Sequence, residues 1–162
     1  MGVSQMNTSI RRSSAGESGR LTEIAHQAKR HWNYPERWIE LWKDTLTITP
    51  DYISSYEVFS ATNEEGVLGF YALIISGEKA TLDHLWIDPN YIGAGLGKEL
   101  FNHAVEKAAE MQASVLEVES DPNAEGFYKH MGARRIGETR SELDGQERIL
   151  PLLALEIKRR SQ

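Results

Sequence analysis

The most informative segment of this 162-residue chain is Tyr91-Ile92-Gly93-Ala94-Gly95-Leu96-Gly97-Lys98. Its three alternating glycines stand between a predicted strand and a predicted helix, where glycine lets the backbone adopt positive φ and approach a ligand closely. Successive amide N–H groups there, added to the positive end of the helix dipole, form an anion site. The segment therefore predicts a loop for phosphate or diphosphate, with Lys98 as an added charge. The competing interpretation is a glycine-rich turn without a ligand.

The flanks of this loop predict a crossover between two parallel strands. Residues 80–87 have strand character, and Asp88-Pro89-Asn90 ends that strand. Apolar residues then recur at intervals of four or three, which predicts an amphipathic helix over residues 95–112. Residues 114–119 predict the next strand. A strand, a helix and a strand in this order are typical of a parallel pair, because parallel strands need a long connection.

The rest of the chain completes a mixed sheet. Two helices are predicted before residue 50, one opened by the capping-box sequence S-A-G-E at residues 14–17 and extending to Trp32, the other starting at Pro35. Asp121 caps a short helix that ends at Gly132. The predicted strands are residues 8–12, 54–62, 67–76, 80–87, 114–119, 133–139 and 149–157.

These elements predict an α/β fold whose mixed sheet is mostly antiparallel, with about seven strands, one parallel pair and about four helices. Pro151 predicts an edge or a bulge in the last strand, because proline cannot donate to a strand ladder. The length fits one domain over residues 1–162, of which residues 1–7 are expected to be a flexible tail.

Composition excludes several classes of protein. The chain has no cysteine, so disulfide scaffolds, thiolate metal sites and a cysteine nucleophile are excluded. Twenty-four acidic against 18 basic residues give a formal charge of −6, which argues against nucleic acid and acidic membranes as partners. No apolar run is long enough to span a bilayer, and residues 1–7 lack the pattern of a secretory signal. We expect a cytoplasmic protein.

Two familiar phosphate loops do not fit the glycine segment. A P-loop requires Ser or Thr after its lysine, but Glu99 follows Lys98 and the spacing is one residue short. A dinucleotide-binding loop would require glycine in place of Lys98, although Glu117 lies about 20 residues on, where that fold places a ribose-binding acid. A nucleotide-binding protein with an unusual loop therefore stays an alternative.

Two motifs together resemble the GNAT superfamily of N-acetyltransferases. The family's first motif is Arg/Gln-x-x-Gly-x-Gly/Ala; Gly95 and Gly97 match it, whereas Ile92 stands at the Arg/Gln position. The second motif is Asn-x-x-Ala-x-x-Phe-Tyr-x-x-x-Gly, in which Asp121 replaces the first Asn and Asn123 is a candidate to take over its role. The residues that match the second motif are Ala124, Phe127, Tyr128 and Gly132.

The resemblance implies acetyl-CoA as cosubstrate and no metal. The diphosphate of CoA would bind the amides of residues 93–98, and its pantetheine arm would pair with the backbone of Leu85, Trp86 and Ile87, where the central parallel strands splay apart in this family. Direct attack in a ternary complex would then acetylate a primary amine of a small molecule or a peptide. The departures at Ile92 and Asp121 keep a non-catalytic acyl-CoA-binding module as an alternative, and the last strand or a helix edge would allow a homodimer.

Acetyl transfer also requires an acid and a base. Tyr128 matches the family's tyrosine, a phenol that is protonated at neutral pH and can protonate the leaving thiolate. A backbone N–H near Leu85 would stabilise the oxyanion, by analogy. Asp83 and His84 are candidate bases, on opposite faces of their strand. Glu117 and Glu119, which share one face of the next strand, are further candidates, although a solvated sheet face is the preferred interpretation for them, and water is another alternative. The cluster of Trp32, Tyr34, Trp38 and Trp42 is interpreted first as core and second as an acceptor-binding wall.

Overall fold

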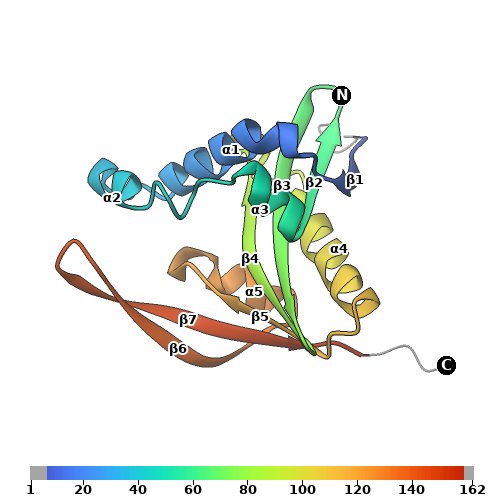
Figure 1. Cartoon of the computed structure of the whole chain (residues 1–162). Coiled ribbons are helices and arrows are strands. Elements are labelled where there is room, and N and C mark those ends of the chain that lie inside the picture. Colours follow the sequence, from blue (N-terminus) through green and yellow to red (C-terminus); the bar gives the residue numbers. More distant parts are fainter. Residues whose placement is uncertain (1–6, 159–162) are drawn as a thin grey trace. The chain divides into compact units, whose positions relative to one another are not determined.

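The computed structural model describes residues 7–158, so the predicted flexible tail falls almost wholly outside the described residues. The strands are β1 (Ser9–Arg12), β2 (Glu57–Asn63), β3 (Gly66–Ser76), β4 (Lys79–Ile87), β5 (Val115–Glu119), β6 (Arg134–Leu143) and β7 (Gln146–Glu156). The α-helices are α1 (Ser18–His31), α2 (Glu36–Leu41), α3 (Pro50–Ser55), α4 (Leu96–Glu110) and α5 (Glu125–His130) (Figure 1). Short 3₁₀ turns are η2 (Ala15–Glu17), η3 (Pro89–Tyr91) and η4 (Pro122–Ala124).

The strands pair in the order β1-β2-β3-β4-β5-β7-β6. The pair β4-β5 is parallel, with Lys79 opposite Val115 and Thr81 opposite Glu117, while β1-β2, β5-β7 and β6-β7 are antiparallel. This confirms the predicted α/β fold with its mixed sheet and parallel pair. Two compact units make up the described chain: the first runs to Ala72 and includes His84–His103, and the second comprises Leu73–Asp83 and the residues from Ala104 on.

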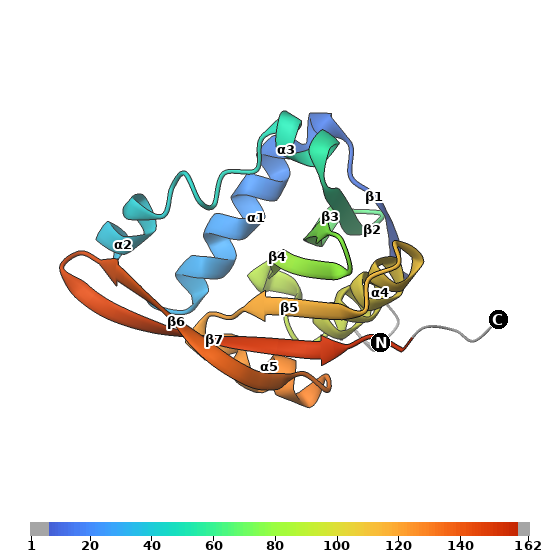
Figure 2. The same cartoon turned by 60° about the horizontal axis from the view of Figure 1, so that its bottom comes forward.

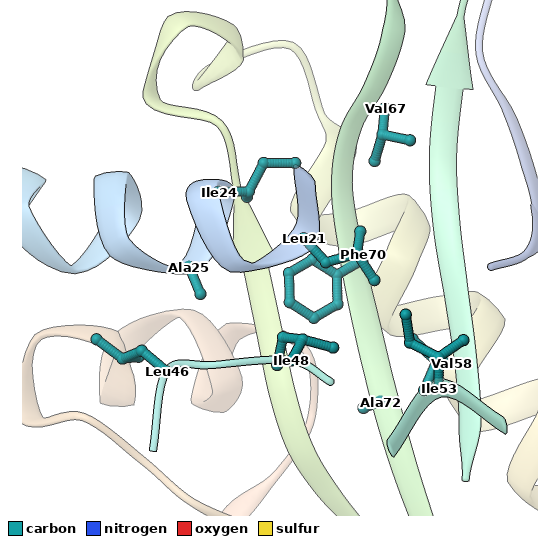
Figure 3. Packing of buried hydrophobic residues seen from close by; sticks show 10 residues of the cluster. All are labelled: Leu21, Ile24, Ala25, Leu46, Ile48, Ile53, Val58, Val67, Phe70 and Ala72. Carbon is teal, nitrogen blue, oxygen red and sulfur yellow. The ribbon is translucent and has the colours of Figure 1, made fainter. Parts of the chain in front are cut away.

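The first unit is built around the apolar face of α1. The 3₁₀ turn η2, which leads into α1, is closed by the predicted capping box, in which the Ser14 amide donates to the Glu17 carboxylate over 2.9 Å. Figure 3 shows how side chains from α1, α3, β2, β3 and the segment before α3 meet in one cluster. The members of this cluster are Leu21, Ile24, Ala25, Leu46, Ile48, Ile53, Val58, Val67, Phe70 and Ala72.

The aromatic residues around α2 follow the prediction only in part: Trp42 packs against the apolar cluster, but Trp32 does not. Trp32 is 39% exposed because α1 ends at His31 and Asn33, with φ of 60°, turns the chain away. Tyr34 and Trp42 instead surround the ammonium group of buried Lys29, which lies 4.9 and 4.1 Å from their ring centroids. These rings therefore form a cation–π cage for a lysine of the chain itself. A second difference is α3, which residues 50–55 form behind an N-cap at Thr49.

The second unit contains a long hairpin. Figure 2 shows β7 running between β5 and β6, and the β6–β7 turn has positive φ at Asp144 and Gly145, as a tight hairpin turn requires. Pro151 was expected at an edge or bulge, but it pairs with Glu138 inside the interior strand β7. Its carbonyl accepts from Ser120 over 2.8 Å on the β5 side. Because proline has no N–H to return that bond, the β5 ladder ends there. The ladder to β6 continues past Pro151, and its register shift between Arg135 and Gly137 lies opposite the neighbouring residues Leu152 and Leu153.

Within residues 7–158, no helix combines the length and the apolar character needed to cross a bilayer. The same residues contain no group of three or more His, Asp or Glu side chains arranged to hold a metal ion.

Candidate functional site

The glycine loop connects η3 to α4 in the first unit. Gly93 and Gly95 have φ of 91° and 83°, values that side-chain-bearing residues rarely adopt. A Cβ atom at either position would meet no other atom within 4 Å. The two glycines are therefore required for backbone conformation rather than for packing, and the space beside them is open.

The amides of this loop are available to a ligand. Among the described residues, none of the amides of residues 93–98 donates a hydrogen bond; the first helical bond of α4 runs from Glu99 N to Gly95 O over 3.1 Å. The first amides of a helix have no partner inside the helix. They carry the positive end of its dipole, so the loop has the donor set that an anion requires. Lys98 is exposed beside it, and Ile92 is 55% exposed.

The turn before the loop is fixed to its surroundings. The Asp88 carboxylate accepts from Asn90 N over 2.9 Å and from Arg20 Nη2 of α1 over 2.7 Å, while the Asp88 amide donates to Leu68 O over 2.8 Å. At the other end of η3, the Tyr91 hydroxyl donates to Glu65. The loop thus begins from a turn held to both α1 and β3.

The end of β4 is where the pantetheine arm was predicted. Leu85, Trp86 and Ile87 are half-buried there. Gly69 of β3 lies directly against this segment, since a Cβ atom on it would be 2.8 Å from the Trp86 carbonyl oxygen and 2.9 Å from Ile87 Cδ1. Only glycine lets β3 approach this part of β4 so closely.

The two candidate bases alternate in exposure as expected: Asp83 is exposed and His84 is 9% exposed. The Trp86 indole donates to His84 Nδ1 over 2.9 Å. An indole N–H can only donate, so Nδ1 is an acceptor and the neutral ring carries its hydrogen on Nε2. His84 also lies edge-on to Tyr52, with ring centroids 5.7 Å apart. His84 is therefore packed like a core residue, and its Nδ1 accepts a hydrogen bond from Trp86.

The second motif lies in the second unit. The Asp121 carboxylate accepts from both the backbone N and the side-chain Nδ2 of Asn123, over 2.9 and 3.0 Å, and so opens η4. Asp121, which stands at the family's Asn position, is therefore hydrogen-bonded to Asn123, the candidate to take over the role of that Asn. After η4, α5 carries Phe127 and Tyr128, and Gly132, with φ of 103°, ends the motif.

Tyr128 is 7% exposed. Burial, with a smaller contribution from the negative charge of Asp121, raises the pKa of its phenol well above the ordinary value of 10.0. The phenol therefore stays protonated throughout the neutral range.

Sequence reasoning missed two features of the first unit that shape the loop. Arg20 is far from Asp88 along the chain, and neither residue belongs to a motif. Gly69 stands inside a predicted strand, where an isolated glycine is a signal of close backbone approach that the sequence analysis did not use.

Comparison with known proteins agrees with these two motifs. Residues 38–145 match the family described as "Acetyltransferase (GNAT) domain". The peptidyl-lysine N-acetyltransferase YjaB of Salmonella typhimurium is 32% identical over 137 residues, which cover 74% of this chain and 89% of that protein. The solution structure of apo YjaB from Escherichia coli has a TM-score of 0.66 at 28% identity, covering 96% of this chain and 100% of that one.

A further similar structure is the PaiA N-acetyltransferase from Thermoplasma acidophilum, crystallised in complex with coenzyme A. Its TM-score is 0.72 at 20% identity, over 93% of this chain and 99% of that one. The chain therefore belongs to the GNAT family of acetyltransferases, which confirms the resemblance seen in the sequence.

Proposed function

We propose that this chain transfers the acetyl group of acetyl-CoA to the side-chain amine of a lysine in a peptide or protein. The cofactor assignment rests above all on the loop of residues 93–98 at the beginning of α4, where no backbone amide donates a hydrogen bond to another described residue. The acceptor half is supported by the relatives, which are named peptidyl-lysine N-acetyltransferases. A net charge of −6 adds a general attraction for cationic acceptors.

The two motifs indicate which residues contact each part of CoA. Amides of residues 93–98 bind the diphosphate, and Lys98 adds charge. The pantetheine arm follows the backbone of Leu85, Trp86 and Ile87. Asp121, Asn123 and Phe127 complete the cofactor contacts on the second motif. The complex of PaiA with coenzyme A supports this choice of ligand for the fold.

In the reaction, the neutral lysine nitrogen attacks the thioester carbon and forms the new C–N bond. The carbonyl oxygen becomes an oxyanion, stabilised by a backbone N–H near Leu85. When the C–S bond breaks, the CoA thiolate takes the proton of Tyr128 and leaves as the thiol. The nitrogen loses one proton to a base or to water, a proton from solvent restores the Tyr128 phenol, and the products are acetyl-lysine and CoA.

That proton from nitrogen needs an acceptor. His84 is the weaker of the two candidates, because its Nδ1 already accepts from Trp86. Exposed Asp83, or water leading to solvent, is the better choice. Asp83→Asn should then lower the rate and alter its pH profile, whereas His84→Gln should act mainly through stability.

The experiment has two arms. Calorimetry measures the affinity of the chain for CoA. An assay of free thiol release, confirmed by mass spectrometry, follows acetylation of a peptide with one lysine and a blocked N-terminus; the same peptide with arginine in place of lysine is the matched control. We expect CoA binding and acetylation of the lysine peptide alone. Absence of CoA binding at millimolar concentration would contradict the cofactor assignment, and CoA binding without lysine acetylation would contradict the acceptor.

A further inference from the structure

We propose that Arg20 is a positioning residue for the CoA-binding loop, which acts by holding and neutralising the carboxylate of Asp88. The inference rests on the proposed function, since it assumes that the loop binds a diphosphate. Neither residue belongs to the motifs that define the family's loop. Their role follows from where the first unit places them.

Asp88 attaches the turn before the loop to α1 and β3 of the first unit. It is 4% exposed, and it lies four positions before Ile92. Its carboxylate fixes the η3 turn through Asn90 N, its carbonyl accepts from Tyr91 N over 2.9 Å, and its amide donates to Leu68 O. Any displacement of Asp88 therefore moves the turn from which the loop starts.

Arg20 holds this carboxylate from α1. Its Nη2 donates to Asp88 Oδ2 over 2.7 Å and to the carbonyl of Val67 over 2.8 Å, and its Nε donates to the same carbonyl over 3.1 Å. One planar guanidinium thus joins α1, the beginning of β3 and the turn before the loop. A lysine has no such fork of donors and cannot make all these contacts at once.

Charge gives the pair a role beyond geometry. A buried carboxylate close to a diphosphate site repels the ligand unless a cation neutralises it. Glu23, the other carboxylate at Arg20, makes the surroundings more negative once the arginine is removed. We therefore infer that Arg20 neutralises the negative charge next to the loop, so that this charge does not repel the diphosphate.

The test is a double-mutant cycle on CoA affinity, measured by calorimetry. Arg20→Ala should weaken CoA binding by about tenfold, because it leaves the Asp88 charge uncompensated. Asp88→Asn alone should weaken CoA binding by less than Arg20→Ala does, because the amide oxygen still accepts from Asn90 N although the bond from Arg20 Nη2 is lost. In the Arg20→Ala background, Asp88→Asn should restore most of the lost affinity. A merely structural arginine would give no such recovery.

Arg11→Ala is the matched control, because Arg11 makes an ion pair with Glu17 at 2.6 Å in the same unit and has no contact with η3 among those recorded for the described residues. If Arg20→Ala binds CoA as tightly as Arg11→Ala, or if Asp88→Asn fails to restore affinity, the inference is wrong while the proposed function stands. A wild-type chain that does not bind CoA contradicts both. Should Arg20→Ala not fold, Arg20→Lys against Arg11→Lys repeats the comparison, and equal affinities overturn the inference.

Discussion

Gly69→Ala is the substitution whose outcome the structure predicts most sharply. Gly69 lies on β3 against the segment of β4 assigned to the pantetheine arm. The added Cβ would be 2.8 Å from the Trp86 carbonyl oxygen, 2.9 Å from Ile87 Cδ1 and 3.2 Å from Leu100 Cδ1. The first of these neighbours is backbone, so it cannot rotate away. The two strands must therefore shift, and Trp86 O must move with them.

The size of the effect follows from two opposing contributions. Overpacking of this kind costs about 2 kcal/mol of folding free energy. Replacing glycine by alanine returns about 0.7 kcal/mol, because the unfolded chain loses conformational freedom. The net loss is about 1.3 kcal/mol, which for a chain of this length lowers Tm by about 4 °C.

Thermal unfolding followed by circular dichroism measures this change. Gly137→Ala is the matched control, because Gly137 also lies in a strand and a Cβ there would meet nothing within 4 Å. We expect the control to leave Tm unchanged or to raise it by about 2 °C. Equal Tm values for the two variants would show that the close approach at Gly69 is not a constraint on β4. Weaker CoA binding by Gly69→Ala alone would tie the same contact to the cofactor.

Three further predictions concern the two motifs. Tyr128→Phe should lower turnover about 100-fold, the size of a lost general acid, while CoA affinity stays as in the wild type; unchanged turnover removes Tyr128 from the acid role. Gly95→Ala should weaken CoA binding and lower Tm, because a residue with an L side chain rarely adopts φ of 83°. The control is Gly77→Ala, at φ of 59° and equally open, which should lower Tm by a similar amount and leave CoA binding intact. Equal CoA affinities of the two variants would argue against the loop as the binding site. The raised pKa of Tyr128 also predicts alkaline sensitivity: the unfolded chain releases this proton near pH 10 and the folded chain retains it, so stability falls as pH rises above about 10. Tyr128→Phe should show a smaller drop in Tm between about pH 9 and 11, and an identical drop would contradict the assigned shift.

Much of the fold was predictable because it depends on local patterns. Alternation placed the strands, the period of apolar residues placed α1 and α4, and the capping box marked where the N-terminal helical region begins. The exceptions depend on contacts between distant residues. Pro151 is tolerated inside β7 because Ser120 ends its strand opposite it, and a single sequence does not indicate that pairing.

The candidate site divides in the same way. The loop was predicted because glycines at positive φ are a property of the local chain. The aromatic residues were harder, since Trp42 packs against the apolar cluster of the first unit and also on the ammonium of Lys29, a contact that helical spacing does not indicate. The bond from Trp86 to His84 decides which histidine nitrogen is available, and no spacing rule indicates it. The ion pair between Arg20 and Asp88 depends on how α1 packs on η3, a tertiary contact that local sequence patterns do not indicate.

The two outermost strands of the sheet, β1 and β6, each carry arginines whose charges are held in place. Arg11 and Arg12 pair with Glu17 and Glu57, and on β6 Arg140 pairs with Glu147. Exposed strand edges are where chains add to one another and begin to aggregate, and charged side chains oppose that addition. An enzyme whose sheet carries charged side chains along both outer strands should stay dispersed at high concentration in low salt, and should lose that protection as ionic strength rises.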